Sequence, residues 1–285
     1  MIPARALVMP VAALFVMACI AGCAPRGGPA VPLAVPGGNM PPMPPLAPAD
    51  ARVEPAALEA AAIEAQRRDA AALLVARNGH VIFERYWRGT RYASPVEAGA
   101  WQGVVDTLLA GALAEDRRPL HGDAPPDPAR IAQAAGMPYK AYLSKRLWRP
   151  IGAFDAVLAP GLRAAQGDWI RIGELLANDG VYQGEEVVRP GWARQVLARF
   201  AVQGEAAPLA SVTDLYRLPG AGAASLWVVP SLRLVILRTG GDLAQGDTAD
   251  DARIAQFVLR GVMDRPGREA GGEGVPDPAT LVPAH

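Results

Sequence analysis

Residues 72–87 decide the fold, and they read ALLVARNGHVIFERYW. The stretch contains two apolar runs, Ala72–Arg77 and Val81–Trp87, which are separated by Asn78-Gly79-His80. An Asn-Gly pair between two such runs is a strong signal for a tight hairpin, because both residues tolerate positive φ angles. The stretch therefore predicts two antiparallel strands.

Further elements with clear patterns lie on both sides of this hairpin. A second pair of β-rich runs, Ser225–Val229 and Leu232–Arg238, predicts another hairpin near the C-terminus. In residues 101–114 the apolar side chains recur at spacings of three and four, which indicates a helix with one buried face. The predicted helices span 55–69, 101–114, 129–148 with a break at 136–138, 168–178 with Asp168 as N-cap, 190–199 and 250–263. Helices combined with antiparallel hairpins predict an α+β fold and exclude a doubly wound parallel sheet.

The composition excludes several classes of function. The 285-residue chain has no formal net charge, and therefore lacks the basic surplus that nucleic-acid binding requires. With 51% apolar and 20% charged residues it is typical of a globular protein. Its two cysteines are too few for a metal cluster. The chain also has no His-Glu-x-x-His motif and no phosphate-binding loop, and we expect neither a metal nor a cofactor. Lysine is rare, since 26 of the 28 basic residues are arginine and only Lys140 and Lys145 are not.

The first residues have the pattern of an export signal. Arg5 is the only charge before Arg26, and the apolar stretch after it ends in Ile20-Ala21-Gly22-Cys23. These four residues resemble a bacterial lipobox, which implies cleavage before Cys23 and attachment of lipid to that residue. An ordinary secretory signal with an incidental cysteine is the alternative. The resemblance implies a lipoprotein of the bacterial cell envelope, and Ala24 after the cysteine favours the periplasmic side of the outer membrane.

Proline and glycine set the expected boundaries of the domain. Residues 24–50 contain nine prolines and four glycines. Such a segment cannot bury enough apolar surface to order itself, so we expect a semi-extended spacer. The expected organisation is a signal peptide over 1–22, a tether over 23–50, one domain over 51–265 and a flexible tail over 266–285.

Four stretches resemble the serine β-lactamase and penicillin-binding-protein-like family, especially its class C and esterase-like members. They occur in that family's order, at 74–86, 139–152, 167–184 and 226–238. The resemblance implies a β-lactamase/transpeptidase-like antiparallel sheet flanked by helices. Residues 115–138 stand where that family has a long and mostly helical insertion, so the resemblance also implies a reduced all-helical half.

The family's chemistry depends on three short motifs, and this chain lacks them. A serine followed by a lysine three residues later forms the nucleophile and its base, because one helical turn brings them together. The resemblance places Ala100 at the serine position and Gly103 at the lysine position, and no serine of the chain has a lysine at that spacing. Tyr-x-Asn and Ser-x-Asn are absent too, and Gly220-Ala221-Gly222 replaces Lys/His-x-Gly. Loss of nucleophile and base together removes the covalent route.

We therefore interpret the chain as a non-catalytic protein with a binding or scaffolding role. Membrane attachment through the lipid is expected, together with cell-wall material or an envelope protein as partner. The alternative is a serine hydrolase with relocated residues, in which Ser94 or Ser225 is the nucleophile and His121 the base, with Asp123 beside it. His121 as an exposed loop histidine is the simpler interpretation. A decaying gene product without a folded role is a third possibility.

Overall fold

The computed structural model describes residues 31–202, 209–241 and 248–268. The predicted signal peptide, Cys23 and residues 269–285 of the predicted tail lie outside these ranges. Within them, no helix combines the length and the apolar character needed to cross a membrane.

A five-stranded antiparallel sheet is the centre of the domain. Its strand order is β3 (His80–Tyr86), β2 (Ala72–Arg77), β11 (Leu234–Thr239), β10 (Ser225–Val229) and β9 (Tyr216–Pro219). The α+β class and both hairpins are confirmed, and Asn78 and Gly79 have positive φ angles of 52° and 78°. The second hairpin differs in one detail, because Pro230–Leu232 form a 3₁₀ turn and β11 begins two residues later than expected.

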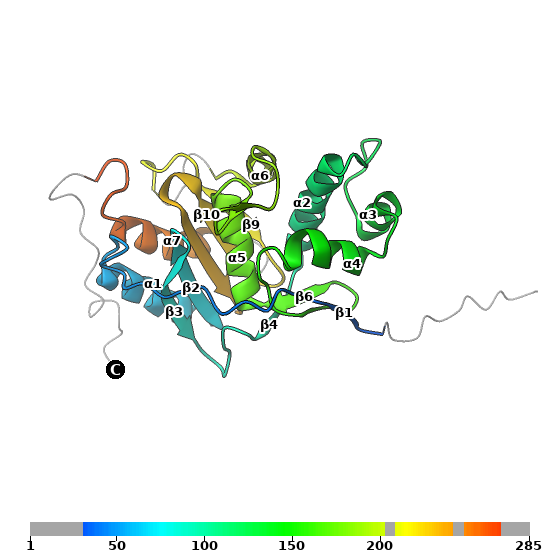
Figure 1. Ribbon diagram of the computed structural model, residues 1–285. Coiled ribbons are helices and arrows are strands. Elements are labelled where there is room, and N and C mark those ends of the chain that lie inside the picture. Colours follow the sequence, from blue (N-terminus) through cyan, green and yellow to red (C-terminus); the bar gives the residue numbers. More distant parts are fainter. Residues whose placement is uncertain (1–30, 203–208, 242–247, 269–285) are drawn as a thin grey trace, which may run out of the picture. The chain divides into compact units, whose positions relative to one another are not determined.

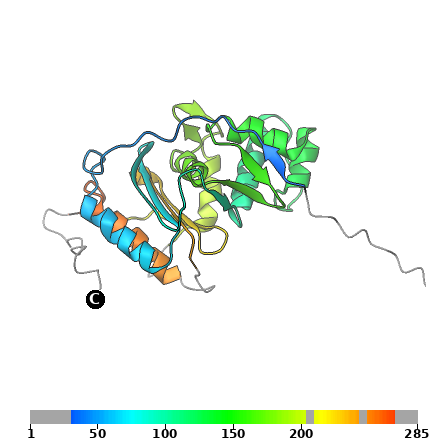
Figure 2. The ribbon, with the colours of Figure 1, turned by 90° about the horizontal axis from the view of Figure 1, so that it is seen from below.

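Both faces of this sheet are covered, which explains why β2, β10 and β11 are buried throughout. Helices α1 (Pro55–Arg67) and α7 (Thr248–Gly261) lie side by side across one face (Figure 2). Helix α5 (Gln166–Ala177) covers the other face (Figure 1). Successive strand residues therefore enter different cores: Leu73 and Val75 contact the α1–α7 layer, whereas Leu74 belongs to the α5 side.

The remaining helices lie beyond α5 (Figure 1). They are α2 (Trp101–Glu115), α3 (Pro128–Ala135), α4 (Tyr139–Leu143) with a π turn at Ser144–Trp148, and α6 (Trp192–Leu197) with a 3₁₀ turn at Ala198–Phe200. The break expected at 136–138 is present, since Gly136 ends α3 with a left-handed φ of 65°. Four tryptophans from the helices and the sheet are almost fully buried: Trp101, Trp148, Trp169 and Trp227.

The prediction of Asp168 as an N-cap is wrong. Ala165 is the N-cap of α5, and Asp168 is the third residue of the helix. The Asp168 carboxylate accepts hydrogen bonds from the backbone N–H groups of Ala165 at 3.1 Å and Phe154 at 2.9 Å. Burial raises the pKa of this carboxyl to about 6.

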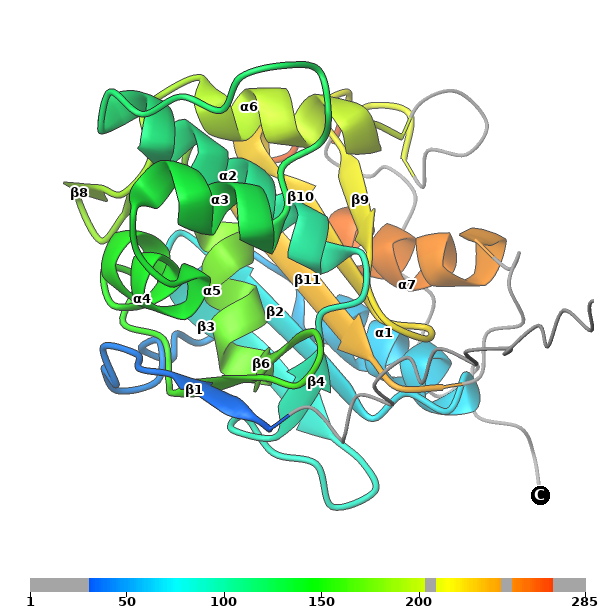
Figure 3. The ribbon, with the colours of Figure 1, turned by 90° about the vertical axis from the view of Figure 1, so that its right-hand side faces the viewer.

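A second sheet of four short strands was not foreseen. Its order is β1 (Leu33–Val35), β5 (Ala156–Leu158), β6 (Leu162–Ala165) and β4 (Pro95–Glu97), and a small ribbon pairs β7 (Val181–Tyr182) with β8 (Glu185–Glu186). Figure 3 shows this sheet below α4 and the lower end of α5.

The prediction of an unpacked spacer is wrong for residues 31–50, which contact the domain. Val35 in β1 is fully buried, and Leu46 donates to the carbonyl of Val81 at 3.0 Å. The buried Arg171 guanidinium also donates to the carbonyls of Met40 and Pro41. A proline lacks only the N–H, so its carbonyl and those of its neighbours remain free to pair with the domain. The packed part of the described chain therefore begins before residue 51 and includes residues 31–50.

Candidate functional site

Helix α2 begins against the turn between β9 and β10. Ala100 precedes the first residue of the helix, and the Trp101 indole N–H donates to the carbonyl of Leu218 at 2.9 Å. The backbones are in close contact, because a Cβ built on Gly99 would lie 2.5 Å from the backbone nitrogen of Ala221. The structure thus brings Ala100 and Ala221 into one neighbourhood, which we call the α2 cleft.

Ala100 and Gly103 both line a cavity of about 150 Å³ in the α2 cleft. The other lining residues are Val104, Thr107, Pro125, Pro126, Val196, Arg199 and Phe200. Thr107 has the only hydroxyl group among them, and it donates to the carbonyl of Gly103 at 2.6 Å. Arg199 is the only charged lining residue, and a guanidinium does not deprotonate in proteins. These walls offer no acid, base or activated nucleophile.

Ser225, the first relocated candidate, is held in a buried network. It is fully buried, and its hydroxyl donates to Asp251 Oδ1 at 2.8 Å. The other oxygen of Asp251 accepts from Arg217 at 2.7 Å and from the Trp227 indole at 3.1 Å. The network fastens α7 to β9 and β10, so the hydroxyl is committed to structure and does not face solvent.

Ser94 and His121 lie in two separate loops. The Ser94 hydroxyl accepts from the Arg91 backbone at 2.9 Å, in the turn before β4. His121 is exposed between α2 and α3, and its carbonyl accepts from Arg130 at 2.7 Å. Within the described ranges, no hydrogen bond joins the imidazole of His121 to Ser94, Ser225 or Asp123. The structure therefore does not assemble the relocated serine–histidine pair.

One buried polar cluster beside the α2 cleft was missed by the sequence analysis. Asp106 accepts from the Tyr139 hydroxyl at 2.6 Å and from Gln102 at 3.1 Å. Gln102 also accepts from the backbone of Leu162 at 3.1 Å, which connects α2 with α4 and β6. Burial raises the pKa of Asp106 to about 6 and also raises that of Tyr139. Two polar residues four apart inside the apolar pattern of 101–114 were the available signal.

A metal centre has no candidate ligand set in the part of the chain that the structure describes. There, no group of three or more histidine, cysteine, aspartate or glutamate side chains is arranged to hold an ion.

Comparison with other sequences gives no match: no family model and no curated protein matches this chain. Comparison with solved structures does. A protein from Bacillus anthracis assigned as a 6-aminohexanoate-dimer hydrolase is 16% identical, with a TM-score of 0.59 over 80% of this chain and 90% of the other. A β-lactamase/D-alanine carboxypeptidase from Yersinia pestis is 12% identical, with a TM-score of 0.52 over 71% and 98% of the two chains.

A third similar structure is a protein from Bacteroides dorei assigned as a β-lactamase. It is 12% identical, with a TM-score of 0.51 over 69% of this chain and 95% of the other. The chain therefore has the fold of the β-lactamase and penicillin-binding-protein-like serine hydrolases, as the sequence resemblance implied. At these identities the similarity concerns the fold alone.

Proposed function

We propose that the protein is a lipid-anchored, non-catalytic scaffold of the bacterial cell envelope that uses a β-lactamase-like fold to hold another envelope protein. One observation supports this most: Ala100 and Gly103 line the cavity of the α2 cleft and Ala221 lies against Gly99, and these are the three positions where the resemblance places the family's reactive side chains. A fold that keeps its helices and sheet without a nucleophile or base is suited to contact, not to covalent catalysis.

The size of the α2 cleft argues against a small-molecule site at this place in the fold. Pockets that bind small molecules usually enclose about 300–1,000 Å³, whereas the cavity beside Ala100 encloses about 150 Å³. Its walls are mostly apolar, and therefore lack the converging polar groups that orient a ligand. A cell-wall glycan does not fit this space, so we propose a protein partner.

The proposal of a non-catalytic protein is tested by covalent labelling. The full chain is incubated with a fluorescent penicillin and followed for hours by gel fluorescence and intact mass. A β-lactamase of the same fold that has its serine is labelled in parallel. We expect no adduct on this protein and no turnover of chromogenic β-lactams or small esters. A stable adduct would overturn the proposal, and its loss in Ser94→Ala or Ser225→Ala would then identify the nucleophile.

The anchor is tested separately, in bacterial cells that express the chain. We expect incorporation of an alkyne-tagged fatty acid and recovery of the protein with the outer membrane. Cys23→Ala should abolish both. Cys19→Ala is the matched control, because that cysteine lies in the part of the signal that the lipobox resemblance removes. Unchanged labelling of Cys23→Ala would contradict lipid attachment at that residue.

The nature of the partner is tested by crosslinking and by sedimentation. Lysine- or arginine-reactive crosslinking in the envelope should trap a defined protein band that survives washing. Co-sedimentation with purified cell-wall sacculi should stay at background. Saturable binding to sacculi would instead assign cell-wall material as the partner and overturn the choice of a protein.

A further inference from the structure

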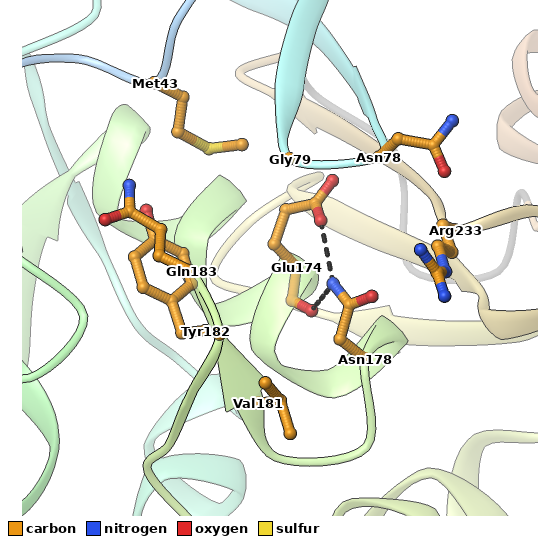
Figure 4. A pocket seen from close by; sticks show the side chains of 10 residues that line it. Met43, Asn78, Gly79, Glu174, Asn178, Val181, Tyr182, Gln183 and Arg233 are labelled. Carbon is orange, nitrogen blue, oxygen red and sulfur yellow. Dashed lines mark hydrogen bonds between the residues drawn. The ribbon is translucent and has the colours of Figure 1, made fainter.

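A cavity that is larger and more polar than that of the α2 cleft lies at the C-terminal end of α5. It encloses about 430 Å³ and is formed by the turn between β2 and β3, the turn between β10 and β11, the β7–β8 ribbon and the segment around Met43. Figure 4 shows Glu174 in its centre, with Met43, Tyr182 and Gln183 on one side and Asn78 and Arg233 on the other. We call it the α5 cavity.

Glu174 is the unusual residue of the α5 cavity, because its carboxylate is buried and only half satisfied. The side chain is 1% exposed. One oxygen, Oε2, accepts from Asn178 at 3.1 Å, whereas Oε1 has no partner within hydrogen-bond geometry among the described residues. The backbone N–H of Gly79 is near enough to the carboxylate to lower its pKa, but it does not complete the bonding of Oε1. An unsatisfied buried oxygen costs free energy, so each such group calls for an explanation.

The surroundings of Glu174 favour a positive charge next to it. The residue lies in the last turn of α5, where the carbonyl groups at the end of the helix give a partial negative charge. Burial raises the pKa of Glu174 to about 7, while the amide of Asn178 and the backbone of Gly79 oppose this rise. A cation in the cavity would lower the pKa of Glu174 further, since it stabilises the ionised form.

Arg233 provides the opposite charge on the rim. It follows the 3₁₀ turn before β11, has a left-handed φ of 43° and is exposed. Its guanidinium forms no hydrogen bond or ion pair with the residues that the structure describes. It is close enough to lower the pKa of Glu174, and an unpaired guanidinium is well shaped to receive a carboxylate.

We propose that the α5 cavity binds a small amino-carboxylate zwitterion, with the ammonium group directed at Glu174 and the carboxylate at Arg233. The ammonium group would supply the donor that Oε1 lacks. The amides of Asn78, Asn178 and Gln183 also line the cavity and can bond polar groups of the ligand. A volume of about 430 Å³ lies within the range of small-molecule pockets. A simple cation would leave Arg233 unpaired and be repelled by it, and a simple anion would face Glu174.

The test is isothermal titration of the full chain with amino acids of increasing charge separation. Glycine, β-alanine, 4-aminobutyrate and 5-aminopentanoate are compared with butylamine and butyrate at constant ionic strength. We expect at least one amino acid to bind with a Kd at least tenfold below both single-charge probes. Glu174→Gln should raise that Kd at least tenfold, and Arg233→Ala at least fivefold.

Three further variants keep this test decisive. Gln183→Lys places a competing cation at the exposed mouth of the cavity and should weaken binding at least fivefold even if Glu174→Gln folds poorly. Glu185→Gln and Arg189→Ala are matched controls, since both residues are exposed nearby but do not line the cavity, and they should change Kd less than twofold.

Three results would overturn the proposal. The first is the absence of heat from every amino acid up to 10 mM. The second is binding that Glu174→Gln and Gln183→Lys leave unchanged. The third is tighter binding of butylamine than of any amino acid, which would assign a simple cation instead.

Discussion

The α2 cleft and the α5 cavity occupy two places in one fold and differ in what lines them. The cavity of the α2 cleft has mostly apolar walls, which include Ala100 and Gly103. The α5 cavity contains a buried carboxylate, three amides and an unpaired guanidinium. The buried Glu174 oxygen without a hydrogen-bond partner therefore lies in the α5 cavity, away from the position to which the family resemblance points. A search guided by motifs alone would stop at the cleft.

The two regions also differ in how tightly their backbones are packed. Gly99 in the α2 cleft and Gly79 in the α5 cavity both have positive φ angles, of 53° and 78°. A Cβ on Gly99 would meet the backbone of Ala221 at 2.5 Å, whereas a Cβ on Gly79 would meet nothing within 4 Å. Main-chain contact therefore leaves no room for a side chain at Gly99, whereas Gly79 faces open space.

The largest expected effect comes from the same substitution in both places. Gly99→Ala should lower the free energy of unfolding by about 3 kcal/mol or more, because positive-φ strain and backbone overlap add together. Gly79→Ala should cost about 1–2 kcal/mol, since only the strain remains. Urea unfolding of both variants and the unmodified chain measures the difference. Equal losses would show that the close contact between Gly99 and Ala221 does not matter for stability.

The second prediction compares the pH dependence of stability of the unmodified chain with that of Glu174→Gln, in which a neutral side chain of the same shape replaces the buried carboxylate. Burial raises the pKa of Glu174 from 4.5 to about 7. A raised carboxyl pKa means that the stability contributed by the protonated form is complete below pH 4.5 and is lost as pH rises through 7. Glu174→Gln does not titrate, so its stability relative to the unmodified chain should rise by roughly 2–3 kcal/mol between these limits and then stay level.

Urea unfolding from pH 4.5 to 8 checks this expectation. Glu185→Gln is the control, because Glu185 is exposed and its replacement should give a difference that does not change with pH. The groups that face Glu174 are Arg233, Asn178, the Gly79 backbone and Tyr182, and burial keeps Tyr182 protonated by raising its pKa to about 12. A flat difference for Glu174→Gln would show that the carboxylate is solvated.

The main sheet could be predicted from sequence because its signals are local. The Asn78-Gly79 turn between two apolar runs specifies a hairpin without reference to the rest of the chain. The small sheet could not be predicted, since β1, β4 and β5 have three residues each and β1 lies among prolines. Those strands exist only through pairing with distant segments, such as Leu33 with Leu158.

The two candidate sites also differ in how much of each the sequence indicated. The close approach of Gly99 to Ala221 brings Ala100 and Ala221 near each other, whereas their assignment to two motifs of the family stays a prediction. Glu174 was not singled out, since a single carboxylate between Gly173 and Leu175 looks like an ordinary polar helix residue. Its burial depends on three turns and on the segment around Met43, which the sequence assigned to a spacer.

The smallest expected effect tests whether the α2 cleft needs its glycine. Gly103 lies inside α2 with nothing within 4 Å of an added Cβ, so Gly103→Ala should stabilise the protein by about 0.5–1 kcal/mol through helix propensity alone. Gly111→Ala in the same helix is the matched control, because its Cβ would lie 2.5 Å from the Trp192 indole nitrogen and should destabilise the protein. Thermal unfolding of both variants measures the contrast. If Gly103→Ala also destabilised the protein, a neighbouring group would lie close enough to Gly103 to clash with the added methyl group. Stabilisation would mean that no neighbouring group requires a glycine at position 103, as expected if this part of the cleft has no tightly packed role.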